Sequence, residues 1–250
     1  MQPQKIVSRE EWLKARKAHL KNEKALTRMH DLVAAERRTL PWVKIEKEYV
    51  FDTPEGKKRL ADLFGKNSQL IVYHFMWRWD QGQGCPSCSF FADHVDGVNI
   101  HLKHHDVTFI AISRGKLDDL VAYKKRLGWK FPLISSYGSD FNFDFGVSFT
   151  EEQLEGKVNY NYTMIDGRKD AFNELPGTSV FYKNENGDVF HTYSSYARGG
   201  DILIGTHNFL DLTPKGRNEG QIMGWVKRND EYEAGDKSAA CCASEKRNVA

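Results

Sequence analysis

Leu70-Ile71-Val72-Tyr73-His74-Phe75-Met76-Trp77 and, shortly after it, Gly84-Cys85-Pro86-Ser87-Cys88 decide the fold of this 250-residue chain. The first run is apolar and aromatic and predicts a buried strand, and the residues from Ser89 onward predict a helix. A Cys-x-x-Cys at a helix start places its first sulfur beside unpaired backbone N–H groups and the positive end of the helix dipole. This environment lowers the pKa of a thiol, and the thiolate is its reactive form. The stretch therefore predicts a redox-active dithiol.

Composition and charge narrow the class of protein. The chain is 40% hydrophobic and 12% aromatic, which suits one large domain with decorations. Its net charge of +2 predicts no strong attraction to nucleic acid or to anionic membranes. The N-terminus is polar and resembles no secretory signal, and no apolar run reaches the length of about 20 residues that a membrane span needs. We therefore expect a soluble cytoplasmic protein that binds neither nucleic acid nor membrane.

The ends of the chain differ in composition from its middle. Ser8-Arg9-Glu10-Glu11 fits a capping box and predicts an amphipathic helix that ends near Arg38. We assign residues 1–48 to an N-terminal helical extension, which packs on the domain or forms the contact of a homodimer. Residues 49–229 form the domain, and the charged, Ala/Gly/Ser-rich residues 230–250 form a flexible tail.

Strands and helices alternate through the domain. We expect strands at Tyr49–Phe51 and Val107–Ser113, a hairpin over Thr178–Tyr193 and an irregular region from Phe131 to Phe149. The expected helices are Pro54 to Phe64, Ser89 to His105, Leu117 to Leu127 and Asp201 to Leu210. This order predicts an α/β protein with a central sheet that is covered by helices on both faces.

The order of elements resembles the thioredoxin fold, and several strings resemble the DUF899 family of thioredoxin-like proteins. These strings are Tyr73-His74-Phe75-Met76, Gly84-Cys85-Pro86-Ser87-Cys88-Ser89-Phe90, Ala92-Asp93-His94, Ser139-Asp140-Phe141-Asn142, Phe190-His191-Thr192-Tyr193-Ser194, Tyr196-Ala197-Arg198-Gly199 and Asp211-Leu212-Thr213-Pro214-Lys215-Gly216-Arg217. The resemblance extends from Ser8 to Tyr232. It implies a central mixed sheet flanked by helices, with the N-terminal helical extension and with insertions before the C-terminal hairpin.

The thioredoxin resemblance also implies roles at the dithiol. Cys85 would be the nucleophile and Cys88 the resolving thiol, although Pro86-Ser87 replaces the Gly-Pro usual in thioredoxins. His74 would replace the buried acid that passes protons to the resolving thiol, or it is a hydrogen-bonded core residue. Pro176 would be the cis-proline that aligns the substrate, or it is a trans loop proline. The alternatives for the dithiol are an inert pair or half of a zinc site, which needs four ligands.

Polar aromatic residues and one guanidinium group gather around the inserted region. They predict either a pocket for a small anionic or aromatic substrate or the hydrogen-bonded rim of a large core. The residues are Asn142, Tyr160, Tyr162, Tyr193, Tyr196 and Arg198. We favour the pocket, with Asn142, Tyr193 and Arg198 as its substrate-binding side chains.

The main hypothesis is a thiol–disulfide oxidoreductase that needs no cofactor and acts on a thiol, a disulfide or another small molecule. The alternative is a copper-binding protein or copper-dependent oxidase, because Cys85, Cys88 and a histidine such as His191 are soft ligands suited to Cu(I). Strand alternation places His191 on the same face as Val189 and Tyr193. A thioredoxin-like binding module without catalysis is a third possibility. Cys241-Cys242 is either part of a solvated tail or a pair that carries electrons or metal ions.

Overall fold

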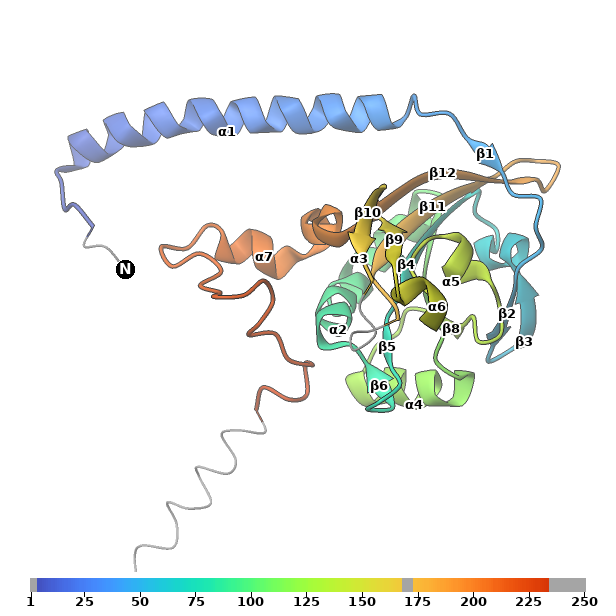
Figure 1. Ribbon diagram of the computed structural model, residues 1–250. Coiled ribbons are helices and arrows are strands. Elements are labelled where there is room, and N and C mark those ends of the chain that lie inside the picture. Colours follow the sequence, from blue (N-terminus) through green and yellow to red (C-terminus); the bar gives the residue numbers. More distant parts are fainter. Residues whose placement is uncertain (1–3, 168–172, 234–250) are drawn as a thin grey trace, which may run out of the picture. The chain divides into compact units, whose positions relative to one another are not determined.

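The computed structural model describes residues 4–167 and 173–233 (Figure 1). The chain divides into two compact units, residues 1–42 and residues 43–250. The first unit contains α1 (Arg9–Arg37), which begins as predicted. Ser8 Oγ accepts from the Glu11 N–H at 3.2 Å, and the Glu11 carboxylate accepts from the Ser8 N–H at 3.1 Å. No residue of α1 is buried, and the homodimer through this helix stays a prediction.

The second unit begins earlier than expected. β1 (Val43–Lys44) pairs with β12 (Val189–Tyr196), so the boundary expected after residue 48 is corrected to residue 42. The cause is the open edge of β12, whose backbone groups gain partners when the chain from Val43 runs beside it.

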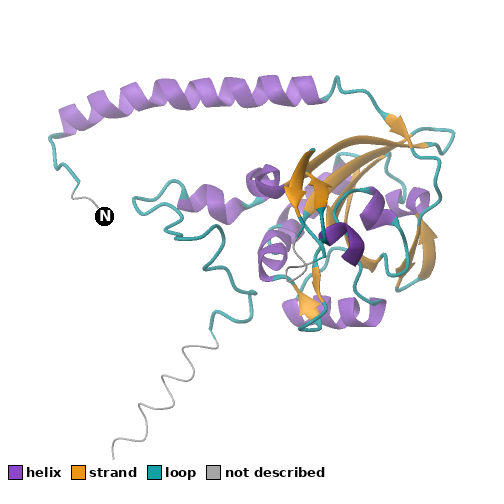
Figure 2. Ribbon diagram, in the orientation of Figure 1, coloured by secondary structure: helices purple, strands orange, loops and turns teal. Residues whose placement is uncertain are grey.

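The central sheet has eight strands in the order β1-β12-β11-β4-β7-β8-β2-β3. β4 (Gln69–His74), β7 (Val107–Ser113) and β8 (Leu133–Ser135) are parallel, and β11 (Gly177–Lys183) runs antiparallel to β4 and to β12. β2 (Val50–Thr53) and β3 (Gly56–Arg59) complete the other edge. The order β12-β11-β4-β7, with one parallel and two antiparallel neighbours, is that of the thioredoxin fold. The predicted fold is confirmed (Figures 1 and 2).

Helices and small strand pairs connect these strands. After β4 come β5 (Trp77–Arg78), β6 (Gln83–Gly84), α2 (Pro86–Ala92) and α3 (Val95–His104), and α4 (Leu117–Leu127) lies between β7 and β8. The expected insertions before the C-terminal hairpin contain α5 (Phe141–Asp144), α6 (Glu151–Leu154), β9 (Lys157–Tyr160) and β10 (Thr163–Asp166). The 3-10 helices η1 (Leu60–Phe64) and η2 (Ala197–Leu203) and the helix α7 (Gly205–Leu210) complete the described elements.

Three predicted helices are wrong in detail. The one over 54–64 is a hairpin turn, β3 and η1, because Gly56 has φ of +105° and the Thr53 hydroxyl donates to the Gly56 carbonyl. The helix over 89–105 breaks at His94, whose ring nitrogens lie 2.7 Å from the Phe90 carbonyl and 2.8 Å from Thr206 Oγ1. The last helix, predicted over 201–210, divides into η2 and α7 because Ile204 is extended.

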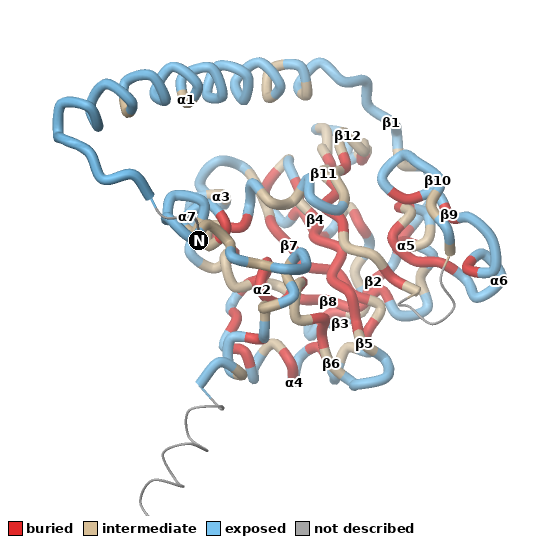
Figure 3. The backbone as a smooth tube through the Cα atoms, turned by 60° about the vertical axis from the view of Figure 1, so that its left-hand side comes forward, coloured by how far each residue is buried: buried red, intermediate tan, exposed pale blue. Residues whose placement is uncertain are grey.

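The side chains of β4 alternate between two hydrophobic layers, and Figure 3 shows the buried chain along β4, β7 and β8. Tyr73 and Phe75 face the layer that includes α2 and α4. Leu70 and Val72 face the opposite layer, which η1 and α5 cover. A residue on β4 therefore faces the dithiol only if its number is odd.

The chain after α7 contacts the domain as far as Glu231. Arg228 is buried, and its guanidinium donates to the Gly84 carbonyl at 2.7 Å and to the Tyr123 hydroxyl at 3.0 Å. Asp230 forms a 2.6 Å ion pair with Arg126. The flexible tail expected from residue 230 is therefore corrected for Asp230 and Glu231, which are anchored by ion pairs to Arg126 and Arg228. Cys241 and Cys242 lie outside the described residues. Among the described helices, none is both long enough and apolar enough to cross a membrane.

Candidate active site around the Cys85–Cys88 dithiol

Cys85 occupies the N-cap of α2, with extended backbone and with Pro86 following at the first helical position. Both cysteines are free thiols in this structure. A hydrogen bond from the Cys88 thiol lowers the pKa of Cys85 to about 6, against the opposing effect of burial. The backbone N–H groups of Cys88 and Ser87 and the charge of Arg78 also favour the Cys85 thiolate. The backbone N–H groups at the start of α2 thus contribute to the low pKa that the sequence predicts for Cys85.

Cys88 has the opposite character. Its side chain is buried, and this burial raises its pKa well above the ordinary value. The charge on the neighbouring Cys85 raises it further, whereas a hydrogen bond with the Tyr73 hydroxyl works in the other direction. Cys85 therefore ionises first, and Cys88 stays a thiol at neutral pH.

A cavity of about 320 Å³ lies beside the two sulfurs. Its walls are mostly apolar and come from α2, the start of β11, η2 and the segment that follows α7. The apolar side chains that line it include Tyr73, Met76, Phe91, Ile204, Ile222 and Met223. Pro176 and Arg198 also line this cavity, so two of the predicted substrate-binding residues lie at the dithiol.

The backbone at Pro176 differs from the cis-proline expectation. The described residues contain no cis peptide bond, so the bond before Pro176 is trans, which is the ordinary state of most X–Pro bonds. Tyr160 holds this segment, because its hydroxyl donates to the Pro176 carbonyl at 2.7 Å and accepts from the Ala197 N–H at 2.9 Å. Arg198 forms an ion pair with Asp201 at 3.1 Å, and both residues line the cavity.

His74 does not face the dithiol, and its predicted role as a proton carrier for Cys88 is corrected. Its ring stacks on Phe141 and Phe145 in the opposite layer, and Nε2 lies 2.8 Å from Ser179 Oγ. Burial lowers its pKa to about 3, so His74 is neutral at pH 7. The physical reason is strand alternation, which directs Tyr73 toward α2 and its neighbour His74 away from it.

The predicted face of His191 is also wrong, because β12 contains a β-bulge. Phe181 pairs with His191 but Val180 pairs with Tyr193, so Thr192 is the extra residue. His191 consequently lies against Phe145 and Phe181, on the other face of the strand from Tyr193. Its Nε2 lies 2.7 Å from Ser194 Oγ.

The predicted copper ligand set is therefore not assembled. Within residues 4–167 and 173–233, no three His, Cys, Asp or Glu side chains lie close enough together to hold a metal ion. His191 belongs to the aromatic layer opposite the dithiol, so it does not supply a third ligand to Cys85 and Cys88.

Two further predicted substrate-binding residues lie away from the dithiol cavity. Asn142 is buried in α5, and its Oδ1 accepts from the Ser136 hydroxyl at 2.7 Å. Tyr193 lines a surface hollow beside Tyr162 and on the outer side of β12. Both predictions are corrected, because neither side chain lines the dithiol cavity. Asn142 belongs to α5, which packs on the opposite layer of the sheet.

Sequence reasoning missed two polar residues at the dithiol. Tyr73 stands next to His74 in the same motif, and asking which face of β4 each side chain takes would have selected it. Glu174 is almost fully buried, and its Oε2 accepts from the Trp77 N–H at 3.0 Å, while Arg114 lies 3.8 Å from Oε1. Burial raises the pKa of Glu174 to about 7, and a negative charge on Cys85 adds to this shift. No local pattern marks Glu174.

Glu174→Gln is expected to change how stability depends on pH. The folded pKa of about 7 lies above the ordinary value of 4.5, so the folded state binds the proton more tightly and stability falls as pH rises between the two. At pH 8 the glutamine variant should be more stable than the original chain by up to about 3 kcal/mol. Urea unfolding at pH 5 and pH 8 measures this difference. Glu152→Gln, at an exposed position, is the control, and equal pH dependence in all three proteins would refute the expectation.

Comparison with known proteins places this sequence in a family. The sequence profile of DUF899, described as "Bacterial protein of unknown function (DUF899)", matches residues 1–232. None of the curated proteins matches the sequence significantly. Similar solved structures include peroxidoxin BcpB of Mycobacterium tuberculosis, with 14% identity over 67% of this chain and 94% of that chain and a TM-score of 0.43. The bacterioferritin comigratory protein of Xanthomonas campestris has 11% identity over 63% and 88% of the two chains, with a TM-score of 0.41.

The family match covers nearly all of the described residues, and it includes the strand, the dithiol and the hairpin that build the site. The order of the strands is that of the thioredoxin fold. The chain belongs to the DUF899 family of bacterial proteins and has a thioredoxin-like fold.

Proposed function

We propose that this protein is a thiol–disulfide oxidoreductase in which Cys85 is the nucleophile and Cys88 the resolving thiol. The observation that carries the proposal is the contrast between the two thiols. The pKa of Cys85 is lowered to about 6, whereas that of the buried Cys88 is raised, and both sulfurs line one cavity. At pH 7 one attacking thiolate and one protonated thiol therefore stand side by side.

The proposed reaction is a two-step exchange. The Cys85 thiolate attacks one sulfur of a substrate disulfide, so a mixed disulfide forms and the other half of the substrate leaves as a thiolate. Cys88 then loses its proton and attacks the Cys85 sulfur, which releases the second half of the substrate. The substrate gains two electrons and the protein holds a Cys85–Cys88 disulfide, which an external dithiol donor reduces again. The Tyr73 hydroxyl supports the second step, because its hydrogen bond favours the Cys88 thiolate.

The dimensions and lining of the cavity indicate the kind of substrate. A volume of about 320 Å³ lies at the lower end of the range for small-molecule pockets, and the walls are mainly apolar. A small disulfide with an apolar body fits this space. Pro176 lines the same cavity as the two cysteines, and the ion pair of Arg198 with Asp201 adds a charged group of each sign to the lining.

The proposal is tested by the pH dependence of Cys85 alkylation with iodoacetamide, in a Cys241→Ser/Cys242→Ser background. The rate is expected to reach half of its maximum near pH 6, because only the thiolate reacts. Cys88→Ala removes the thiol hydrogen bond and should move this midpoint to higher pH. A midpoint at about pH 8.5, the ordinary pKa of a free cysteine, in the protein that retains Cys88 would contradict the proposal.

A further inference from the structure

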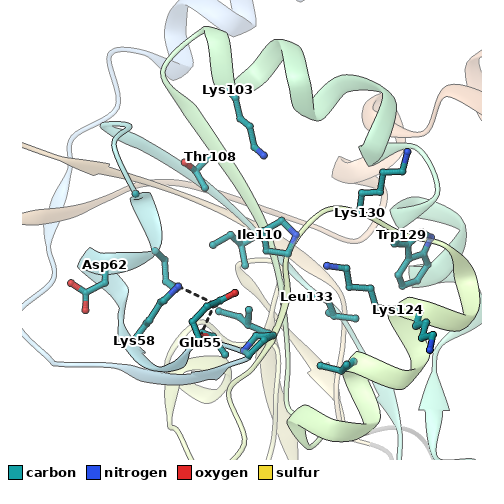
Figure 4. Close-up of a pocket in the computed structure, with 18 residues that line it drawn as sticks. Glu55, Lys58, Asp62, Lys103, Thr108, Ile110, Lys124, Trp129, Lys130 and Leu133 are labelled. Carbon is teal, nitrogen blue, oxygen red and sulfur yellow. Dashed lines mark hydrogen bonds and ion pairs between the residues drawn. The ribbon is translucent and has the colours of Figure 1, made fainter.

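A second cavity, of about 750 Å³, lies at the other end of the parallel strands, at the start of β7 and β8 (Figure 4). Its base is apolar and includes Ile110 of β7 and Leu133 of β8. The turn that joins β2 to β3 forms one side, and α3 and α4 form the others. None of the catalytic groups proposed above lines this cavity.

The pairing of the strands explains why space exists here. β8 pairs with β7 from Ala111 to Ser113, and the register of β2 with β8 includes only the pair Asp52 and Ser135. The hairpin of β2 and β3 therefore diverges from β8, and the first half of β7 lies open beside it. The backbone topology of the sheet therefore contributes to the opening of this cavity.

Five lysines from four segments line this cavity. They are Lys58 of β3, Lys103 of α3, Lys124 and Lys125 of α4, and Lys130 before β8. In Figure 4 Lys103 points down from the top, Lys124 and Lys130 lie to the right of Ile110 and Leu133, and Lys58 lies to their left.

The two acidic residues of the cavity already have partners. Glu55 pairs with Lys58 at 3.0 Å, and Asp62 pairs with Arg59 at 3.2 Å. In the part of the chain that the structure describes, Lys103, Lys124, Lys125 and Lys130 form no ion pair. The cavity thus collects four uncompensated positive charges in a protein whose whole net charge is +2.

Helix ends account for part of this pattern only. Lys103 and Lys124 and Lys125 lie in the last turns of α3 and α4, where a cation is favourable beside the helix carbonyl groups. That effect acts on each helix separately, so it does not explain why α3 and α4 bring their lysines to the same cavity. It also does not apply to Lys130, which follows α4. The lysines around this apolar base give the cavity a positive potential that attracts an anion.

We propose that this cavity binds a small organic polyanion, namely an apolar or flat body that carries two or more phosphate groups. Lysine ammonium groups suit phosphate oxygens as mobile point charges. An inorganic ion would leave most of a 750 Å³ space unfilled, whereas the apolar base gives an organic body a surface to cover. The site shares no residue with the dithiol cavity, so this proposal does not depend on the proposed redox function.

The test is isothermal titration calorimetry of the full chain with ADP and with pyrophosphate as probes, at 50 mM and 200 mM salt. ADP is expected to bind at one site per chain, at least tenfold more tightly than pyrophosphate, and more weakly at the higher salt concentration. Lys103→Gln/Lys125→Gln should weaken ADP binding at least tenfold. Lys21→Gln/Lys215→Gln, which removes two exposed lysines elsewhere, should leave it unchanged.

Each other outcome overturns the inference. No saturable ADP binding below millimolar concentration would exclude the site, and equal losses in the two double variants would indicate a general charge effect. Equal affinity for ADP and pyrophosphate would show that the apolar base takes no part. Thermal melts that match the original chain confirm that each variant is folded.

Discussion

Cys85→Ser is expected to reduce the catalysed reduction of bis(2-hydroxyethyl) disulfide by dithiothreitol to the rate of the buffer alone. The reason is that Cys85 supplies the thiolate, and a serine hydroxyl does not ionise near pH 7. Cys88→Ser should retain the first attack but stop the second. When it is incubated with the disulfide alone, without dithiothreitol, it should therefore accumulate one substrate half on Cys85 as a mixed disulfide, which intact-mass spectrometry detects.

The matched control for this experiment is Cys241→Ser/Cys242→Ser, which removes the other pair of thiols in the chain. This variant should retain the full rate. Full activity in Cys85→Ser, or loss of activity in the control alone, would show that the reaction does not depend on Cys85 and Cys88.

Arg228→Ala is expected to lower the free energy of unfolding by about 3 kcal/mol. Arg228 is only 4% exposed, and its guanidinium donates to the Gly84 carbonyl and to the Tyr123 hydroxyl. Its removal leaves the Gly84 carbonyl and the Tyr123 hydroxyl, both buried, without their charged donor. Gly84 is the residue that precedes Cys85. Urea unfolding measures the loss, and Arg228→Lys should restore only part of it, because one ammonium group cannot replace the planar fork.

Arg126→Ala is the matched control for Arg228→Ala, because Arg126 binds the same segment of chain through Asp230 and Glu231 but is 38% exposed. Its loss should cost less than about 1 kcal/mol, as is usual for exposed ion pairs. Equal losses in the two variants would show that the depth of Arg228 is unimportant and that the segment is held mainly by surface charges.

The sequence predicted the framework where local pattern and tertiary structure agree. The apolar run before the dithiol became β4, Ser8 capped α1, and the turn Asn184–Gly187 joined β11 to β12. Alternation and helix capping depend on neighbours in the chain, so they are visible before the fold is known. The helix predicted over 54–64 failed because Gly56 at positive φ turned the chain into a hairpin.

The candidate site was predicted less completely, because its other members meet only through tertiary contacts. The choice of His74 over Tyr73 was wrong since the face of β4 that carries the dithiol depends on where α2 packs. The bulge at Thr192, which turns His191 away from Tyr193, leaves no mark in the residue pattern. Glu174 and Arg228 reach the surroundings of Cys85 from far along the chain.

The most direct test of the central claim is thiol mapping by mass spectrometry after equilibration of the protein with reduced and oxidised glutathione at a series of ratios. We predict that the peptide containing Cys85 and Cys88 loses two hydrogens and regains them reversibly, with a single midpoint, as a disulfide forms and is reduced. If both thiols remain open to alkylation at every ratio, the dithiol is not redox-active and the proposed function is wrong.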